Sequence, residues 1–126
     1  MDWTMETDET RGTIAFTMQG EWDASEVIEA IEALWPEQIR TGFLRVLWDM
    51  RGMDGGGVET AEVRDVATHH LTTRPELPES RAAVVTSGDL EFGMARMTEA
   101  FITESPVDMQ IFRNIEKACE WLEEEG

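Results

Sequence analysis

The chain has 126 residues, of which 41% are hydrophobic and 29% are charged, the size and composition of one globular domain. Its 27 acidic residues outnumber its 10 basic residues and give a formal net charge of −17, so nucleic acid and anionic membrane surfaces are poor partners. No apolar run approaches the roughly 20 residues that span a bilayer, the N-terminus lacks a secretory pattern, and the single Cys119 excludes an internal disulfide. We therefore expect a single domain over residues 1–126, cytoplasmic and without membrane insertion.

The N-terminal third of the chain predicts a β-hairpin followed by a helix. Residues 2–7 and 13–19 alternate apolar with polar side chains, which is typical of two half-buried strands. A capping-box pattern that begins at Asp23 predicts the start of an amphipathic helix. We expect this helix to end at Trp35, because the residue before Pro36 is disfavoured in helical conformation.

The stretch from Phe43 to Gly57 is the most informative part of the sequence. Its almost continuous apolar run, which ends at Asp49, is typical of a strand buried on both faces. A polar loop with three successive glycines follows, and a second helix is predicted around residues 63–71. Open α/β sheets bind ligands where such a strand turns into a helix, so this stretch is the first candidate for a site.

The C-terminal half continues the alternation of strands and helices. We predict a strand over residues 81–85, a helix over 90–101, a strand over 107–112 and a helix over 115–122. The order is ββαβαβαβα, which predicts an α/β fold with a mixed, mostly parallel sheet of about five strands and about four helices.

Three stretches of the sequence carry a resemblance to a known family. They are residues 46–52, residues 82–85 with the helix segment 93–97 and Phe101, and the ending 111–122 with its strand, Phe112 and closing Trp-Leu. In this order the chain resembles the SpoIIAA-like proteins of the STAS and CRAL-TRIO-like fold group. The family has no established common biochemical activity, so the resemblance is compatible with a regulatory or protein-interaction module, and it also allows lipid-like ligands, which related CRAL-TRIO domains bind.

The chain departs from the STAS pattern at one functional position. STAS domains that antagonise anti-sigma factors carry an Asp-Ser-Ser-Gly type motif, whose serine a partner kinase phosphorylates. The similar place here begins at Asp54 and continues with three glycines, so it holds no hydroxyl, and Thr60 already belongs to the predicted helix. We therefore expect no phosphoacceptor serine in this protein.

Two polar loops, residues 49–57 and 86–89, follow strands that should be parallel, so they should lie at the same edge of the sheet. Glycines there permit close approach of a partner, although an ordinary turn with nothing bound explains the same residues. The first hypothesis is a non-enzymatic module that binds a protein partner or a second copy in a homodimer through this edge. The contact surface would include residues 49–58 and the start of the third helix near Ser87 and Asp89. The candidate ligand- or partner-binding residues of the two hypotheses together are Trp48, Asp49, Met50, Arg51, Met53, Asp54, Gly55, Gly56, Gly57, Ser87, Asp89 and Phe92.

The second hypothesis is a carrier of a small apolar or amphipathic ligand. Apolar side chains are less expected in a polar loop than in a core. Where they occur in or near such a loop, they often mark a pocket or an interface. The pocket would be lined by Trp48, Met50, Met53, Phe92 and Met97.

We find no pattern that indicates an enzyme, a metal or a cofactor. Asp49, Asp54 and Asp89 offer oxygen ligands for Mg²⁺ or Ca²⁺, but they lack the spacing of an EF-hand and suit turn and capping roles. The adjacent His69 and His70 point about 100° apart on a helix and do not form a two-ligand site together. We expect neither metal nor cofactor, and no catalytic residues.

Overall fold

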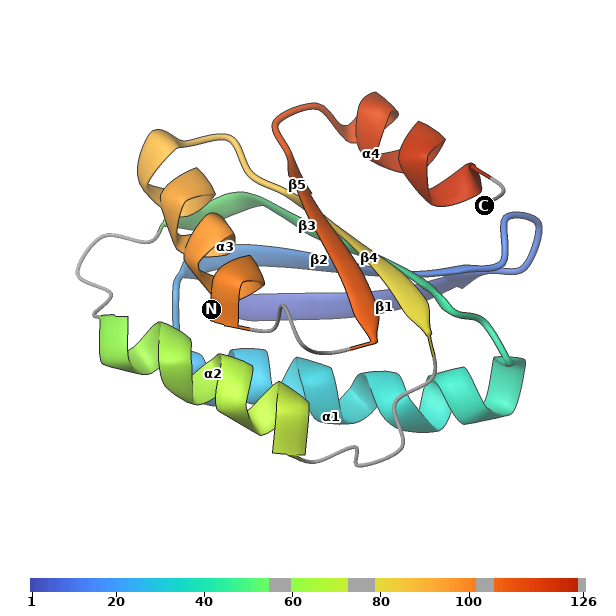
Figure 1. Ribbon diagram of the computed structural model, residues 1–126, viewed down its shortest axis with the longest axis horizontal. Helices are drawn as coiled ribbons and strands as arrows, with labels where there is room; N and C mark the ends of the chain where they lie inside the picture. Colours follow the sequence, from blue (N-terminus) through green and yellow to red (C-terminus); the bar gives the residue numbers. More distant parts are fainter. Residues whose placement is uncertain (55–59, 73–78, 102–105, 125–126) are drawn as a thin grey trace.

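The computed structural model describes residues 1–54, 60–72, 79–101 and 106–124. Its elements follow the predicted order ββαβαβαβα (Figure 1). They are β1 (Asp2–Asp8), β2 (Thr13–Glu21), α1 (Ala24–Thr41), β3 (Arg45–Asp54), α2 (Thr60–Thr72), β4 (Ser80–Val85), α3 (Asp89–Phe101), β5 (Val107–Phe112) and α4 (Ile115–Glu123). The predicted α/β class, with five strands and four helices, is confirmed.

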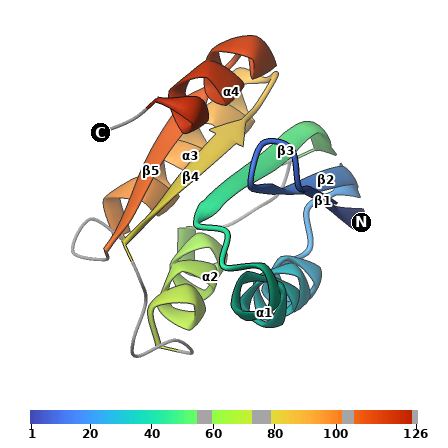
Figure 2. The same cartoon turned by 90° about the vertical axis from the view of Figure 1, so that its right-hand side faces the viewer.

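The sheet has the order β1-β2-β3-β4-β5, the same as the order of the strands along the chain. β1 and β2 are antiparallel, and the other three neighbouring pairs are parallel. Right-handed crossovers that always step in the same direction bring their helices to the same face of a sheet. Figures 1 and 2 show the result, in which α1, α2 and α3 cover one face and α4 lies on the other.

The two faces of the sheet have separate apolar cores. Val46 and Trp48 of β3 belong to the larger core under α1, α2 and α3. Leu47, between them in the sequence, points to the opposite face and packs with Ala118 and Leu122 of α4. Successive residues of a strand point to opposite faces, so a strand covered on both sides needs apolar residues at every position. This is the physical reason for the apolar run seen in the sequence.

Helix α1 does not end at Trp35 as predicted but continues through Pro36 to Thr41. Proline removes one helical hydrogen bond at a cost of about 3 kcal/mol, and contacts beyond it offset this cost. Glu37 accepts a hydrogen bond from the Thr7 hydroxyl of β1, and the next turn packs Gln38 inward, 5% exposed. The helix ends at Gly42, whose φ of 73° is left-handed and whose N–H donates to the Gln38 carbonyl at 2.7 Å.

Strand β3 likewise does not end at Asp49 but runs to Asp54. β2 is longer than predicted, reaches Glu21 and continues to pair with β3 after an irregularity between Thr17 and Gln19. The Trp22 N–H then donates to the Asp54 carbonyl at 2.9 Å. Most of the predicted loop is therefore strand, and its polar residues 51, 52 and 54 are exposed on it.

Candidate functional site

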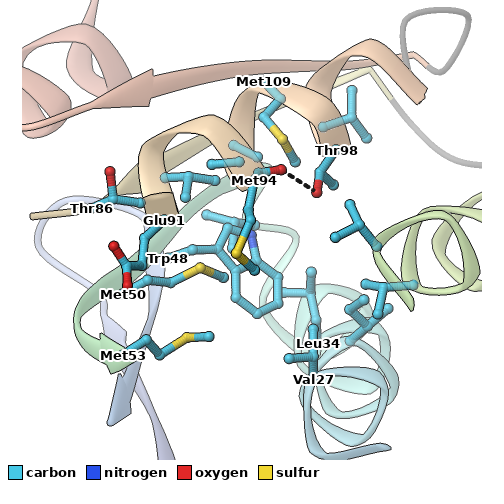
Figure 3. A pocket seen from close by; sticks show the side chains of 18 of the residues that line it. Val27, Leu34, Trp48, Met50, Met53, Thr86, Glu91, Met94, Thr98 and Met109 are labelled. Atoms are coloured by element: carbon cyan, nitrogen blue, oxygen red, sulfur yellow. Dashed lines mark hydrogen bonds between the residues drawn. The ribbon is translucent and has the colours of Figure 1, made fainter. Parts of the chain in front are cut away.

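A cavity of ≈ 100 Å³ lies between the sheet and helices α1, α2 and α3 (Figure 3). Its walls come from β3, β4 and β5 and from all three helices, so it lies within the larger core. The lining residues are Trp22, Val27, Ile31, Leu34, Gln38, Val46, Trp48, Met50, Met53, Val63, Val66, Ser80, Ala82, Val84, Thr86, Glu91, Met94, Ala95, Thr98, Val107 and Met109. Protein interiors are close-packed and hold few voids larger than a water molecule, so this space stands out from ordinary packing.

The floor of the cavity is rigid and apolar. Trp48 is 5% exposed, and its ring stacks on Phe16 of β2 with centroids 4.3 Å apart and planes at 13°. Trp3 of β1 in turn lies against Phe16 at 5.9 Å. This row of rings fixes the indole that faces the cavity in Figure 3, so the floor does not collapse into the empty space.

Four methionines line the cavity, two from β3 and one each from α3 and β5: Met50, Met53, Met94 and Met109. Methionine is unbranched, flexible and polarizable, and it adapts to ligands of different shape. Met50 and Met94 are half-buried while Met53 is 8% exposed. The cavity thus combines a rigid aromatic floor with side chains that can move.

One side of the cavity is polar, beyond the carboxyl end of β4. Thr86 follows β4 directly, is 1% exposed, and its Oγ1 has no hydrogen-bond partner in the part of the chain that the structure describes. Glu91, in the first turn of α3, extends its carboxylate on the same side as Thr86 and Met50 (Figure 3). By contrast, the Thr98 hydroxyl further along α3 donates to the Met94 carbonyl at 3.1 Å and is satisfied. The Thr86 hydroxyl is thus a buried polar group that bonds to none of the described residues.

Two arginines at this edge of the sheet, Arg51 and Arg113, form ion pairs with carboxylates. The Arg51 guanidinium donates from Nε and Nη2 to the two carboxylate oxygens of Asp49, at 2.9 and 2.8 Å. Hydrogen bonds from Arg51 lower the pKa of Asp49, and the carboxylate raises the pKa of Arg51. Arg113 pairs with Asp89 at 2.6 Å. Neither arginine belongs to the lining of the cavity.

The structure divides the predicted contact residues between two places. Trp48, Met50 and Met53, which the second hypothesis names, line the cavity. Phe92 and Met97, which it also names, are absent from the lining. Phe92 instead lies under the Arg113 guanidinium, 4.4 Å from the ring centroid. Arg113 comes directly after β5, so Phe92 faces that segment, whereas Met94 lines the cavity.

The other predicted residues that the structure describes lie at this edge of the sheet, outside the cavity lining. Asp49, Arg51 and Asp54 belong to β3, and the Ser87 hydroxyl donates to the Arg51 carbonyl at 2.9 Å. The two predicted segments therefore do meet, as the parallel strands require. Asp89 is the first residue of α3. Gly55, Gly56 and Gly57 lie outside the described residues, as does the side chain of His70.

The sequence predicted the segment 86–89 but did not single out Thr86 within it, and it did not indicate Glu91, Met94 or any cavity residue of α1 and α2. Thr86 carried a usable signal, since it is a polar residue directly after a buried strand at the edge where α/β sheets bind ligands. The helical residues carried none, because the apolar stripe of a helix looks the same whether it meets a filled core or an empty space.

Other site types find no support in the described ranges. No group of three or more His, Cys, Asp or Glu side chains there is arranged to hold a metal ion. None of the described helices is both long and apolar enough to cross a membrane.

Comparisons with known proteins agree with this fold. A solved structure of an uncharacterized protein from the DUF3478 family of Shewanella loihica PV-4, which has a SpoIIAA-like fold, is similar with a TM-score of 0.56. The similarity covers 96% of this chain and 92% of that chain at 18% sequence identity. The search of curated proteins finds no match. A family model described as SpoIIAA-like matches residues 13–123, so the protein belongs to the SpoIIAA-like family.

Proposed function

We propose that this protein binds a small apolar molecule, or the apolar end of a small amphiphile, in the cavity under α1, α2 and α3. The observation that carries the proposal is the ≈ 100 Å³ of unfilled space on a fixed Trp48 floor. A cavity of about 150 Å³ with apolar walls is enough to bind benzene. The ligand is therefore about the size of one aromatic ring or a short alkyl chain, and the role is binding without catalysis.

The burial of the lining residues indicates where a ligand enters. Ala82 and Val84 of β4 are both 4% exposed and form the closed side. The lining residues Thr98, Val107 and Met109 are half-buried, and so are Met50, Glu91 and Met94, which bring the cavity near solvent between β3 and the start of α3. Two of these last three side chains are methionines, whose rotation can admit a ligand without any backbone movement.

Benzene is a direct probe of the cavity. We expect a benzene titration of the ¹⁵N-labelled protein to give saturable amide shifts in residues of β3, β4 and α3 near the cavity. Ala95→Leu adds three carbon atoms at a lining position that is 9% exposed, and should weaken benzene binding at least tenfold. Ala100→Leu makes the same change at an exposed position of α3 and should leave binding unchanged. Benzene binding that is absent, or equal in Ala95→Leu and the wild type, would refute the proposal.

Native mass spectrometry of freshly purified protein, repeated after denaturation, tests for a ligand retained from the cell. A mass excess that disappears on denaturation supports a carrier. The same spectra give the stoichiometry of any complex.

A second candidate is contact with a protein partner through the edge formed by Asp49, Arg51 and Ser87. The Ser87–Arg51 hydrogen bond favours it, because it joins the two predicted segments into one continuous surface. Ser87 is exposed, so Ser87→Arg should reduce capture of a partner or of a second copy without unfolding the domain. Capture that is unchanged in Ser87→Arg would remove this surface from consideration.

A further inference from the structure

The polar side of the cavity restricts the chemistry of the ligand's head group, an inference that rests on the binding function proposed above. Two oxygen-bearing side chains lie there, the Thr86 hydroxyl and the Glu91 carboxylate. Thr86 is 1% exposed and its hydroxyl has no partner among the described residues. A buried hydroxyl without a partner costs about 1–3 kcal/mol, and a ligand group that bonds to it would recover part of this free energy.

The charged side chain that lines the cavity, Glu91, disfavours an anion. None of the lining residues is Lys, Arg or His. The two guanidinium groups described at this edge, those of Arg51 and Arg113, already bond to Asp49 and Asp89. The whole chain has a formal net charge of −17, so its field attracts cations and repels anions.

We propose that the ligand is a small primary amine with an apolar body, whose ammonium group donates hydrogen bonds to Glu91 and Thr86. An ammonium has three donors and no acceptor, which suits a site made of a carboxylate and a hydroxyl. Removing an ammonium from water is costly unless it is paired. Glu91 provides the pairing charge and, being half-buried, leaves part of the ion pair in contact with solvent.

Three ligands with the same six-carbon chain but different head groups distinguish the contribution of the head group to binding from that of the apolar chain. Hexylamine, 1-hexanol and hexanoate are cationic, neutral and anionic, and each is titrated into the full chain by isothermal calorimetry or by amide shifts. We expect hexylamine to bind at least tenfold more tightly than hexanoate, with hexanol between them.

Two variants assign the preference to named groups. Glu91→Gln should reduce the difference between hexylamine and hexanoate to less than threefold, and Thr86→Val should weaken hexylamine and hexanol while leaving benzene unaffected. Glu120→Gln makes the same change of charge at an exposed position of α4, on the other face of the sheet, and should retain the tenfold preference. Circular dichroism of each variant checks that the fold is intact.

The outcomes distinguish this inference from the function on which it rests. Equal binding of the three ligands, tighter binding of hexanoate, or a preference for the amine that survives in Glu91→Gln would overturn the amine assignment. If benzene still bound, the apolar cavity would remain a binding site. Failure of benzene and of all three ligands to bind would overturn both proposals.

Discussion

Replacing Thr86 by valine should make the ligand-free protein more stable. Valine has nearly the shape of threonine but carries a methyl group in place of the hydroxyl. Thr86 is 1% exposed and its Oγ1 has no hydrogen-bond partner in the described part of the chain. The hydroxyl therefore loses hydration on folding and gains nothing in exchange, at a cost of about 1–3 kcal/mol.

The expected gain in the free energy of unfolding is about 1–2 kcal/mol, the lower part of that range, because the cavity beside Thr86 allows some relaxation. The backbone N–H of Thr86, which donates to the Phe112 carbonyl at 3.0 Å, is untouched by the substitution. For a domain of this size each kcal/mol corresponds to about 4 °C in melting temperature. Urea unfolding should show a higher midpoint with an unchanged m-value.

Thr13→Val is the matched control. Thr13 is also buried, 7% exposed, but its hydroxyl donates to the Arg11 carbonyl at 3.4 Å. The same substitution there removes a bonded hydroxyl and should leave stability unchanged or lower it. A Thr86→Val protein no more stable than the wild type would show that the hydroxyl is already satisfied, and the argument for a polar end of the cavity would fail.

Two further predictions concern backbone conformation and pH. Gly93 lies inside α3 with open space around it, so Gly93→Ala should stabilise the protein by about 0.5–1 kcal/mol. Gly42 ends α1 with a left-handed φ of +73°, so Gly42→Ala should destabilise the protein by about 1 kcal/mol. If urea unfolding gave both substitutions the same sign, the role of Gly42 as the C-terminal cap of α1 would be contradicted. Hydrogen bonds from Arg40 and then Thr7 lower the pKa of Glu37 from 4.5 to about 2, so its contribution to stability is present above pH 4.5 and is lost as the pH falls toward 2. The free energy of unfolding should fall less steeply over this range in Glu37→Gln than in the wild type, whereas parallel profiles would show that the pairing does not persist in solution.

The sequence predicted the order of the elements because each element has a local cause. The apolar run around Trp48 follows from burial on both faces of the sheet, and Asp23 caps α1 by accepting hydrogen bonds from Ser25 N and Glu26 N at 2.9 and 3.4 Å. Both causes lie within a few neighbouring residues, so they are visible without tertiary structure.

The errors arose where a distant contact decides the outcome. The residues after Pro36 stay helical partly because Glu37 bonds to Thr7 of β1, thirty residues earlier in the chain. β3 continues past Asp49 because a longer β2 is available to pair with it. The cavity was even less predictable from the sequence. It exists because side chains from three helices and the sheet leave a volume between them unfilled, and no local sequence pattern indicates such a space.

The strands have the same order in the sheet as along the chain, and this has a consequence for how the domain folds. Each of the strands β2 to β5 pairs with the strand made just before it, so none of them has to insert between two strands that are already joined. Each new β-α unit can add to the growing edge as the chain leaves the ribosome, N-terminal part first. Pairing between consecutive elements keeps loop-closure costs low and favours rapid folding. Helix α4 comes last and then covers the other face of β3, β4 and β5, the strands it contacts.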